Sequence, residues 1–187
     1  MSGWNDCIVV LMDLIGIKKR ALEGDSAASA VMLSFHSLVC RELAKGMGAL
    51  DHVYVWNDSV LLLSFIDHRP ETYEMAIRSA DKLKQKVDLI APSYAIAVKG
   101  RAFPSNAGHY GSRVTLIKAS SYAMANCFEI EAEAKKKKLR GKTWYIDIRI
   151  ARMVRAATAP EWISVPLLPG GKRRRVYAHE GYLWGGI

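Results

Sequence analysis

The sequence predicts an α+β domain in which helices pack on an antiparallel sheet, and three observations support this class. Runs of consecutive apolar residues, typical of buried strands, alternate with longer segments whose apolar residues recur every three or four positions, as on helices. Two apolar runs, 52–56 and 59–65, are separated by only two polar residues, which predicts a hairpin. The order strand, helix, strand, strand, helix, strand then predicts the ferredoxin-like βαββαβ arrangement, with its helices on one face of the sheet.

Each element is read from local signals. Residues 6–13 form a run rich in Ile and Val, typical of a central buried strand. A helix over 25–45 begins at the capping residue Asp25 and ends at the glycines that follow it. Besides the hairpin, the remaining elements are expected at 70–89 (helix), 94–103 (strand), 118–137 (helix), 143–148 (strand), 149–156 (helix), 162–165 (strand) and 175–179 (strand).

The composition indicates a single domain over residues 1–187. A chain of this length can bury a core, and 50% hydrophobic with 24% charged residues is ordinary for a globular protein. No apolar stretch approaches the roughly 20 residues of a membrane span, and the N-terminus lacks the basic region of a signal peptide, so we expect a cytoplasmic protein without membrane contact. The three cysteines lie in apolar segments without CxxC spacing and are expected to be reduced core thiols.

The formal net charge of +9 favours anionic partners: nucleotides, nucleic acid or an acidic membrane face. Much of this charge is concentrated in two segments, 135–142 and 172–175. For the four consecutive lysines at 135–138, a solvated helix end is the structural alternative to a binding role.

Two aspartates occupy matched places in the predicted fold. Asp13 ends the first strand, and Asp58 lies in the polar break of the hairpin. Because the first and third strands are neighbours in a βαββαβ sheet, the topology brings the two carboxylates together. Either aspartate alone has a structural explanation, as a strand end or a turn residue. Together they repel each other unless a cation neutralises them, and oxygen ligands without His or Cys suit Mg²⁺ or Mn²⁺.

Around these aspartates the sequence resembles the class III nucleotidyl cyclases. That family carries Asp-x-x-Gly at the end of the first strand, matched here by Asp13–Gly16, and a second metal aspartate in the following hairpin, matched by Asn57–Val60. Asn57 replaces the usual glycine. The resemblance covers roughly residues 6–150 and includes the order of the strands.

The resemblance implies a site for two metal ions about 3.5–4 Å apart, which together activate a hydroxyl and stabilise a transferring phosphorus. Asp13, the carbonyl of Leu14 and Asp58 are the implied metal ligands, with Asp13 and Asp58 essential for catalysis. Gly16 and Ile17 are the implied backbone contacts to the substrate phosphates, at the start of a helix.

The position four residues before the second metal aspartate, which reads a purine in adenylate and guanylate cyclases, is Tyr54 here. With Arg101 on the following strand, this is similar to the uridylate (pyrimidine) cyclases of Pycsar antiphage systems. The resemblance implies conversion of UTP to 3′,5′-cyclic UMP and pyrophosphate by a homodimer with sites across its interface, and a separate effector that responds to the product. Cyclic CMP stays open as the product, and a core aromatic is the structural alternative for Tyr54.

The chain departs from the family on its late helix. Purine cyclases carry Asn-x-x-x-Arg there, for ribose and transition-state charge, whereas this chain has Tyr122 and Asn126 at that spacing. Either another cation, such as Lys118, Lys172 or Arg173, substitutes for the missing arginine, or catalysis is weaker.

Two alternative functions stay open. One is a catalytically degenerate homologue that binds nucleotide and metal without turnover. The other is an RNA-binding ferredoxin-like module, because Lys99–Phe103 partly matches an RNP1 motif. Arg101 stands where the first stacking aromatic of that motif belongs, so nucleotide is preferred over nucleic acid as the partner.

Overall fold

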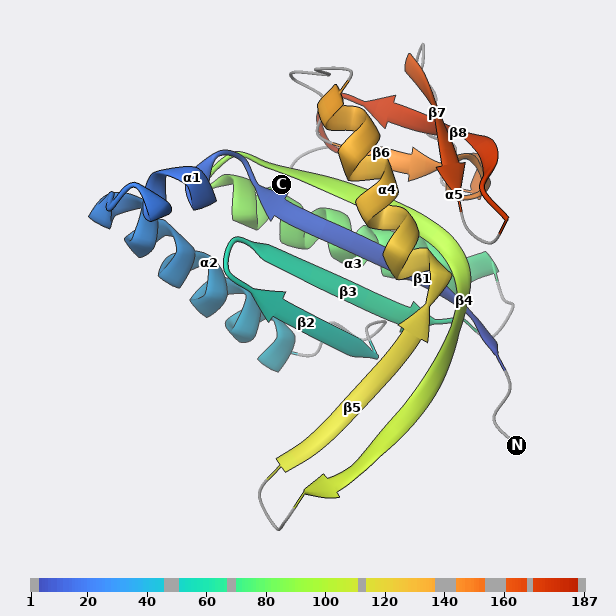
Figure 1. Ribbon diagram of the computed structural model, residues 1–187, viewed down its shortest axis with the longest axis horizontal. Helices are drawn as coiled ribbons and strands as arrows, with labels where there is room; N and C mark the ends of the chain where they lie inside the picture. The colour runs from blue at the N-terminus through green and yellow to red at the C-terminus, as the bar shows by residue number, and fades with distance from the viewer. Residues whose placement is uncertain are drawn as a thin grey trace.

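In the computed structural model, a mixed sheet carries helices on both of its faces (Figure 1). The structure describes residues 4–45, 51–66, 70–110, 114–136, 144–153, 161–167 and 170–184. The elements are β1 (Asn5–Leu14), α1 (Ile17–Leu22), α2 (Ser26–Ala44), β2 (His52–Trp56), β3 (Ser59–Phe65), α3 (Pro70–Asp88), β4 (Ser93–Tyr110), β5 (Val114–Ser121), α4 (Tyr122–Lys136), β6 (Trp144–Asp147), α5 (Ile148–Met153), β7 (Glu161–Leu167) and β8 (Lys172–His179).

The strands follow the order β2-β3-β1-β4-β6-β8-β7, and β5 pairs with β4 outside this path. Strand β1 lies in the middle, antiparallel to both β3 and β4. The order of the first four strands is that of the predicted ferredoxin-like core, which is therefore confirmed. Strand β6 joins β4 in parallel and continues the sheet into the β7–β8 hairpin.

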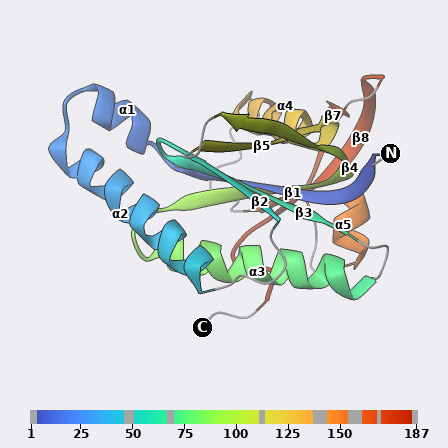
Figure 2. The ribbon, with the colours of Figure 1, turned by 90° about the horizontal axis from the view of Figure 1, so that it is seen from below.

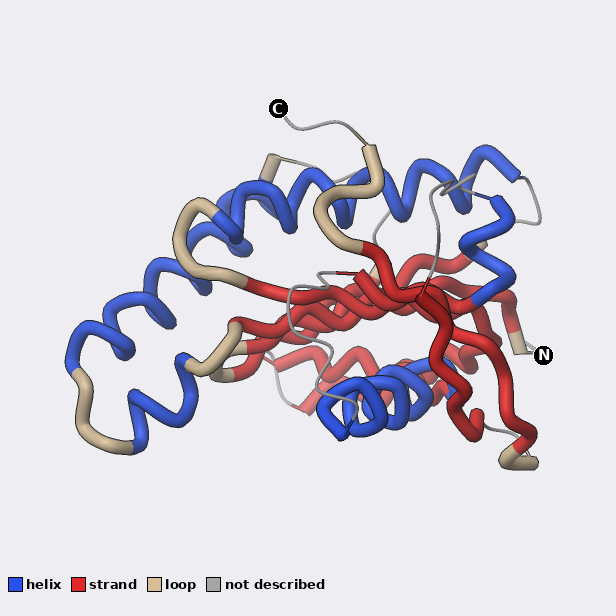
Figure 3. The backbone as a smooth tube through the Cα atoms, turned by 90° about the horizontal axis from the view of Figure 1, so that it is seen from above, coloured by secondary structure: helices blue, strands red, loops and turns tan. Residues whose placement is uncertain are grey.

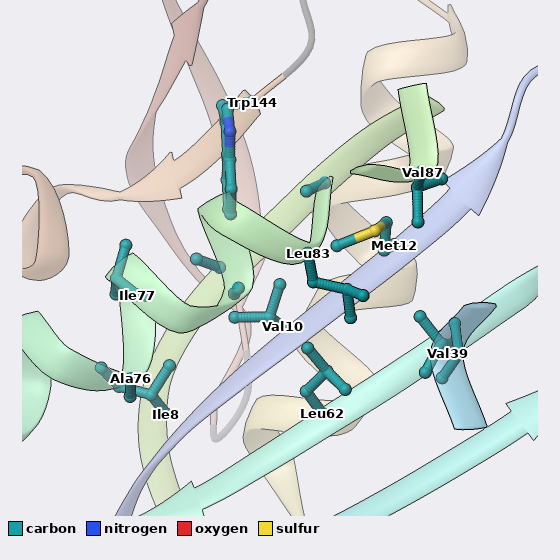
Figure 4. Close-up of a cluster of buried hydrophobic side chains, with 14 of the residues drawn as sticks. Ile8, Val10, Met12, Val39, Leu62, Ala76, Ile77, Leu83, Val87 and Trp144 are labelled. Carbon is teal, nitrogen blue, oxygen red and sulfur yellow. The ribbon is translucent and has the colours of Figure 1, made fainter. Parts of the chain in front are cut away.

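Alternate residues of β1 point to opposite faces of the sheet and build two separate cores. Ile8, Val10 and Met12 pack with α2 and α3 in one apolar cluster, shown in Figure 4. The odd-numbered residues from Cys7 to Leu11 pack under α4 in the other. The two helices of the predicted βαββαβ unit, α2 and α3, share one face, as expected. Helix α4 follows that unit and covers the opposite face, so helices lie on both faces of the sheet (Figures 2 and 3).

Three elements differ from the expectation. Residues 118–121, expected to begin a helix, belong to strand β5, and β4 runs on to Tyr110, so that the two strands extend as a ribbon beyond the sheet (Figure 1). Their pairing is a contact between strands, which helical periodicity in one segment cannot reveal. The short helix α1 was not predicted, because six residues are too few to show a helical period.

The three cysteines are free, as expected, but only Cys7 and Cys127 belong to the core, whereas Cys40 is exposed on α2. None of the described helices has the length and apolar character needed to cross a membrane.

Helix α4 sits close on β4 at Gly100. A Cβ atom built on this glycine would lie 2.6 Å from Cβ of Ala123, inside any normal carbon–carbon contact. We therefore expect Gly100→Ala to destabilise the protein by about 1–3 kcal/mol through overpacking. Urea unfolding of Gly100→Ala and of the double variant Gly100→Ala/Ala123→Gly checks this: the second change removes the clashing methyl group and should recover part of the loss. Equal stability of the single variant and the wild type would contradict the close approach.

The C-terminal segment is hydrogen-bonded to α3 through one buried carboxylate. Asp81 is 1% exposed and accepts hydrogen bonds from the backbone amides of Leu183 (3.2 Å) and Trp184 (3.3 Å). The indole nitrogen of Trp144 (3.0 Å) and the side-chain amide of Gln85 (3.1 Å) donate to it as well. Asp81 thus joins α3, β6 and the chain's last described turn.

Candidate metal centre

The structure brings Asp13 and Asp58 together at one end of the sheet. Asp13 pairs in register with Ser59, the residue after Asp58, on the neighbouring strand β3. The backbone amide of Leu14 donates to the carbonyl oxygen of Asp58 at 2.9 Å, so the end of β1 is tied to the β2–β3 turn. Asp58 is only 6% exposed. The adjacency predicted from topology is therefore present.

The turn that carries Asp58 explains the asparagine at position 57. Asn57 has a φ of 47°, in the left-handed region that favours glycine and that asparagine tolerates better than other residues. The ring of His36 on α2 hydrogen-bonds to the Asn57 carbonyl and supports the turn from the side. Asparagine can therefore take the place of the glycine expected there.

The carboxylate of Asp13 is held by two hydroxyl donors. Ser59 donates to Oδ1 at 2.5 Å, and Tyr94 on β4 donates to Oδ2 at 2.7 Å. Burial raises the pKa of Asp13, the two hydrogen bonds lower it, and the charges of Asp58 and Glu131 raise it further, with a net upward shift. Burial thus has the largest effect on this carboxyl group, and the neighbouring negative charges add to it.

The residues present fit a divalent cation of the Mg²⁺ or Mn²⁺ kind. Within the described part of the chain, neither Asp13 nor Asp58 forms an ion pair with a lysine, arginine or histidine. Two neighbouring like charges, one half-buried and one buried, are costly without a cation, and a bound cation removes that cost. The described residues hold no group of three or more His, Cys, Asp or Glu side chains suited to a metal. Two carboxylates are nevertheless enough for Mg²⁺, which is commonly held by one or two carboxylates together with waters and substrate phosphates.

Gly16 and Ile17 lie next to this centre. Gly16 has a φ of 76° with open space around its α-carbon, so glycine is needed there for its backbone conformation rather than for room. Ile17 begins α1, which has no side-chain cap, and the first amides of a helix lack acceptors within it. The amide of Ile15 already donates to the carbonyl of Pro92 at 2.9 Å, so the amides open to a phosphate start at Gly16.

Tyr54 lies on the α4 face of the sheet, the face to which Asp13 also points. It pairs in register with Leu61 of β3 and packs, half-buried, against the cluster under α4. Since Leu61 in turn pairs with Leu11 of β1, Tyr54 sits two strands across and two residues along from Asp13. Tyr54 therefore belongs to the same end of the sheet as the aspartate pair.

Arg101 lies elsewhere. It pairs in register with Asp6 at the start of β1, and its Nε atom is 3.5 Å from Oδ1 of Asp6. Lys99, two residues earlier on the same side of β4, places its ammonium 4.3 Å from the centre of the Tyr73 ring on α3. Arg101 thus projects from the α3 face, whereas Tyr54 faces α4. Within one chain the two predicted base-reading residues are not brought together.

The predicted ribose and phosphate residues of the late helix do not gather at the aspartates. Tyr122, at the start of α4, is 47% exposed and stacks on Trp4, with ring centres 5.8 Å apart. Asn126 is 3% exposed and belongs to the packed side of the helix. Its role as a ribose contact stays a prediction.

The predicted substitute cations are also spread out. Lys172 is exposed at the start of β8, in a hairpin two strands beyond β4. Arg173 donates from Nε to Oγ of Ser164 at 3.1 Å on the neighbouring strand. The side chain of Lys118 lies outside the described residues.

Three residues at this centre were missed by sequence reasoning: Tyr94, Glu131 and Lys135. The Tyr94 hydroxyl lies 2.5 Å from Oε1 of Glu131 on α4, and Lys135 forms an ion pair with the same oxygen. Tyr94 is directly opposite Asp13 in the β1–β4 register. That register, together with the placement of α4 on this face, was the missing information.

No family model and no curated protein matches the sequence. The fold, by contrast, is similar to solved cyclase domains. The adenylyl cyclase CyaB from P. aeruginosa matches with a TM-score of 0.65 at 8% identity, over 94% of each chain. The dimeric guanylyl cyclase domain of RhoGC from the fungus Blastocladiella emersonii gives 0.61 at 11% identity, over 95% of this chain and 97% of that one. The guanylyl cyclase Cya2 gives 0.57 at 13% identity, over 96% and 95%.

These likenesses show that the chain has the fold of class III cyclase catalytic domains. The similarity extends over almost the whole of each chain.

Proposed function

We propose that this protein is a nucleotidyl cyclase, which converts a nucleoside triphosphate to a 3′,5′-cyclic nucleotide and pyrophosphate. The observation that carries the proposal is the pair of half-buried Asp13 and buried Asp58, held side by side without a cationic partner among the described residues. The cyclase fold supports it, although a fold alone hosts many functions.

The chain's own residues would act as follows. Asp13, the carbonyl of Leu14 and Asp58 hold Mg²⁺ or Mn²⁺, in two positions, and the amides of Gly16 and Ile17 bind phosphate oxygens. When bound, the ions supply acidification of the ribose 3′-hydroxyl and neutralisation of phosphate charge. The 3′-oxygen forms a bond to the α-phosphorus, the bond to the bridging oxygen of the β-phosphate breaks, and the hydroxyl proton leaves to solvent.

We further propose UTP as the substrate, with cyclic UMP as a second messenger in antiphage defence that a separate effector reads. Tyr54 supports a pyrimidine, because an aromatic side chain narrows a base pocket and its hydroxyl can hydrogen-bond the base edge. Since Arg101 faces the other side of the sheet, we assign the base contact to Tyr54.

A homodimer with two-fold symmetry is part of this proposal, with Tyr54 of one protomer meeting the nucleotide held at the aspartates of its partner. We propose that the cation that purine cyclases carry on the late helix is supplied here by Lys118 or by a basic residue of the partner chain.

The test is incubation of the purified protein with each of the four nucleoside triphosphates and Mn²⁺, followed by chromatography of the products and gel filtration of the protein. We expect cyclic UMP and pyrophosphate from UTP, little product from the other three, and a dimer. Cyclic CMP as the main product would move the base assignment to cytosine. Tight nucleotide binding without pyrophosphate release would indicate a degenerate homologue, and salt-sensitive RNA binding without turnover would indicate an RNA-binding module.

A further inference from the structure

The hydroxyl group of Tyr94 lies between two carboxylates, and only one of them belongs to the proposed metal ligands. Its oxygen is 2.7 Å from Oδ2 of Asp13 and 2.5 Å from Oε1 of Glu131. A phenol has one proton to donate. The Tyr94 hydroxyl therefore donates its proton to one carboxylate at a time, and Glu131 competes with Asp13 for this hydrogen bond.

The position of this hydroxyl is fixed from several sides. Tyr94 pairs directly with Asp13 across β1 and β4, and its ring packs edge-on against Tyr145, with centres 6.3 Å apart at 79°. Glu131 is itself held by the ion pair with Lys135 one turn later on α4. A continuous chain of contacts therefore runs from α4 through Tyr94 to Asp13.

The two donors on Asp13 determine how its carboxylate is presented. Each carboxylate oxygen has two lone pairs. Ser59 occupies one lone pair of Oδ1 and Tyr94 one of Oδ2, so each oxygen keeps one lone pair for another partner. Removing either donor frees the carboxylate to rotate and lowers the fraction of time that both oxygens face a cation.

We propose that Tyr94 is a positioning residue for the metal centre. Its hydroxyl, steered by Glu131 and Lys135, fixes the orientation of Asp13 and couples helix α4 to cation binding. The inference rests on the proposed function only for the role of Asp13 as a metal ligand.

The experiment is a titration of the full chain with Mn²⁺ in the absence of nucleotide, following the free-ion signal by electron paramagnetic resonance. We expect Tyr94→Phe to bind Mn²⁺ about 10- to 100-fold more weakly than the wild type. Tyr145→Phe is the matched control, since it removes a hydroxyl from the neighbouring ring and should leave Mn²⁺ affinity within about twofold. Circular dichroism verifies that both variants are folded.

Turnover provides a second readout. In Tyr94→Phe the Mn²⁺ concentration for half-maximal turnover should rise by the same factor, while kcat at saturating Mn²⁺ stays within about threefold, because excess cation compensates for a loosely held ligand. Unchanged Mn²⁺ affinity in Tyr94→Phe, or equal weakening in Tyr145→Phe, would overturn the inference, and so would a wild type that binds no Mn²⁺. Mn²⁺ binding that depends on Asp13 and Tyr94 without formation of any cyclic nucleotide would instead sink the proposed cyclase activity alone.

Discussion

Asp58→Asn protein is expected to remain folded and to lose at least ~1,000-fold in nucleotide turnover, since a catalytic cation contributes several kcal/mol and each 1.4 kcal/mol is a factor of ten. Asp58 is buried beside Asp13, and the charge of Asp58 contributes to the raised pKa of Asp13. Neutralising Asp58 removes that repulsion. The pKa of Asp13 should therefore fall towards its ordinary value.

The combination of lost activity and retained stability is the specific signature of this prediction. Without metal, Asp58→Asn should be at least as stable to urea as the wild type, and Mn²⁺ should no longer raise its unfolding temperature. Asp51→Asn is the matched control: Asp51 is exposed, stands just before β2, and accepts a hydrogen bond from the Phe65 amide that an asparagine oxygen can also accept. Turnover of Asp58→Asn at the wild-type rate with Mn²⁺ would contradict both the metal centre and the proposed reaction.

Asp81→Leu is expected to cause the largest loss of stability, about 4 kcal/mol. The leucine cannot accept the hydrogen bonds of Trp144, Gln85 and the two backbone amides of the C-terminal segment. A buried donor left unpaired costs roughly 1–3 kcal/mol, and the indole of Trp144 is fully buried. For a chain of this size, the unfolding temperature should fall by about 10 °C.

The same change should also release the C-terminal segment. The guanidinium carbon of Arg78 lies over the Trp184 ring, 4.5 Å from the ring centre. In Asp81→Leu, the Trp184 backbone amide loses its hydrogen bond to Asp81. A truncated chain ending at Glu180 should therefore lose less stability on Asp81→Leu than the full chain does, because part of the network is already absent. Glu74→Gln is the control, since Glu74 forms a half-exposed pair with Arg78 on the same helix and should shift stability by less than about 0.5 kcal/mol. Equal losses in the full and truncated chains would contradict the anchoring role of Asp81.

Much of the core architecture could be predicted from local pattern. The apolar run of β1 and the two-residue break between β2 and β3 are visible along the chain, and both elements lie within a residue of their predicted bounds. The order of the elements was sufficient to place Asp13 beside Asp58, because a βαββαβ chain places its first and third strands next to each other. Strand β5 and the face covered by α4 were not predictable in this way.

There is a physical reason why some features could be predicted from the sequence and others could not. Side-chain periodicity and turn chemistry are properties of neighbouring residues, so the sequence by itself determined the core strands, the long helices and the aspartate pair. Register and packing depend on contacts between distant segments. Tyr94 lies 81 positions from Asp13 and 37 from Glu131, yet its single hydroxyl meets both. Only the tertiary structure could decide that Tyr94 holds Asp13, that Arg101 turns to the opposite face from Tyr54, and that Asp81 receives the C-terminal segment.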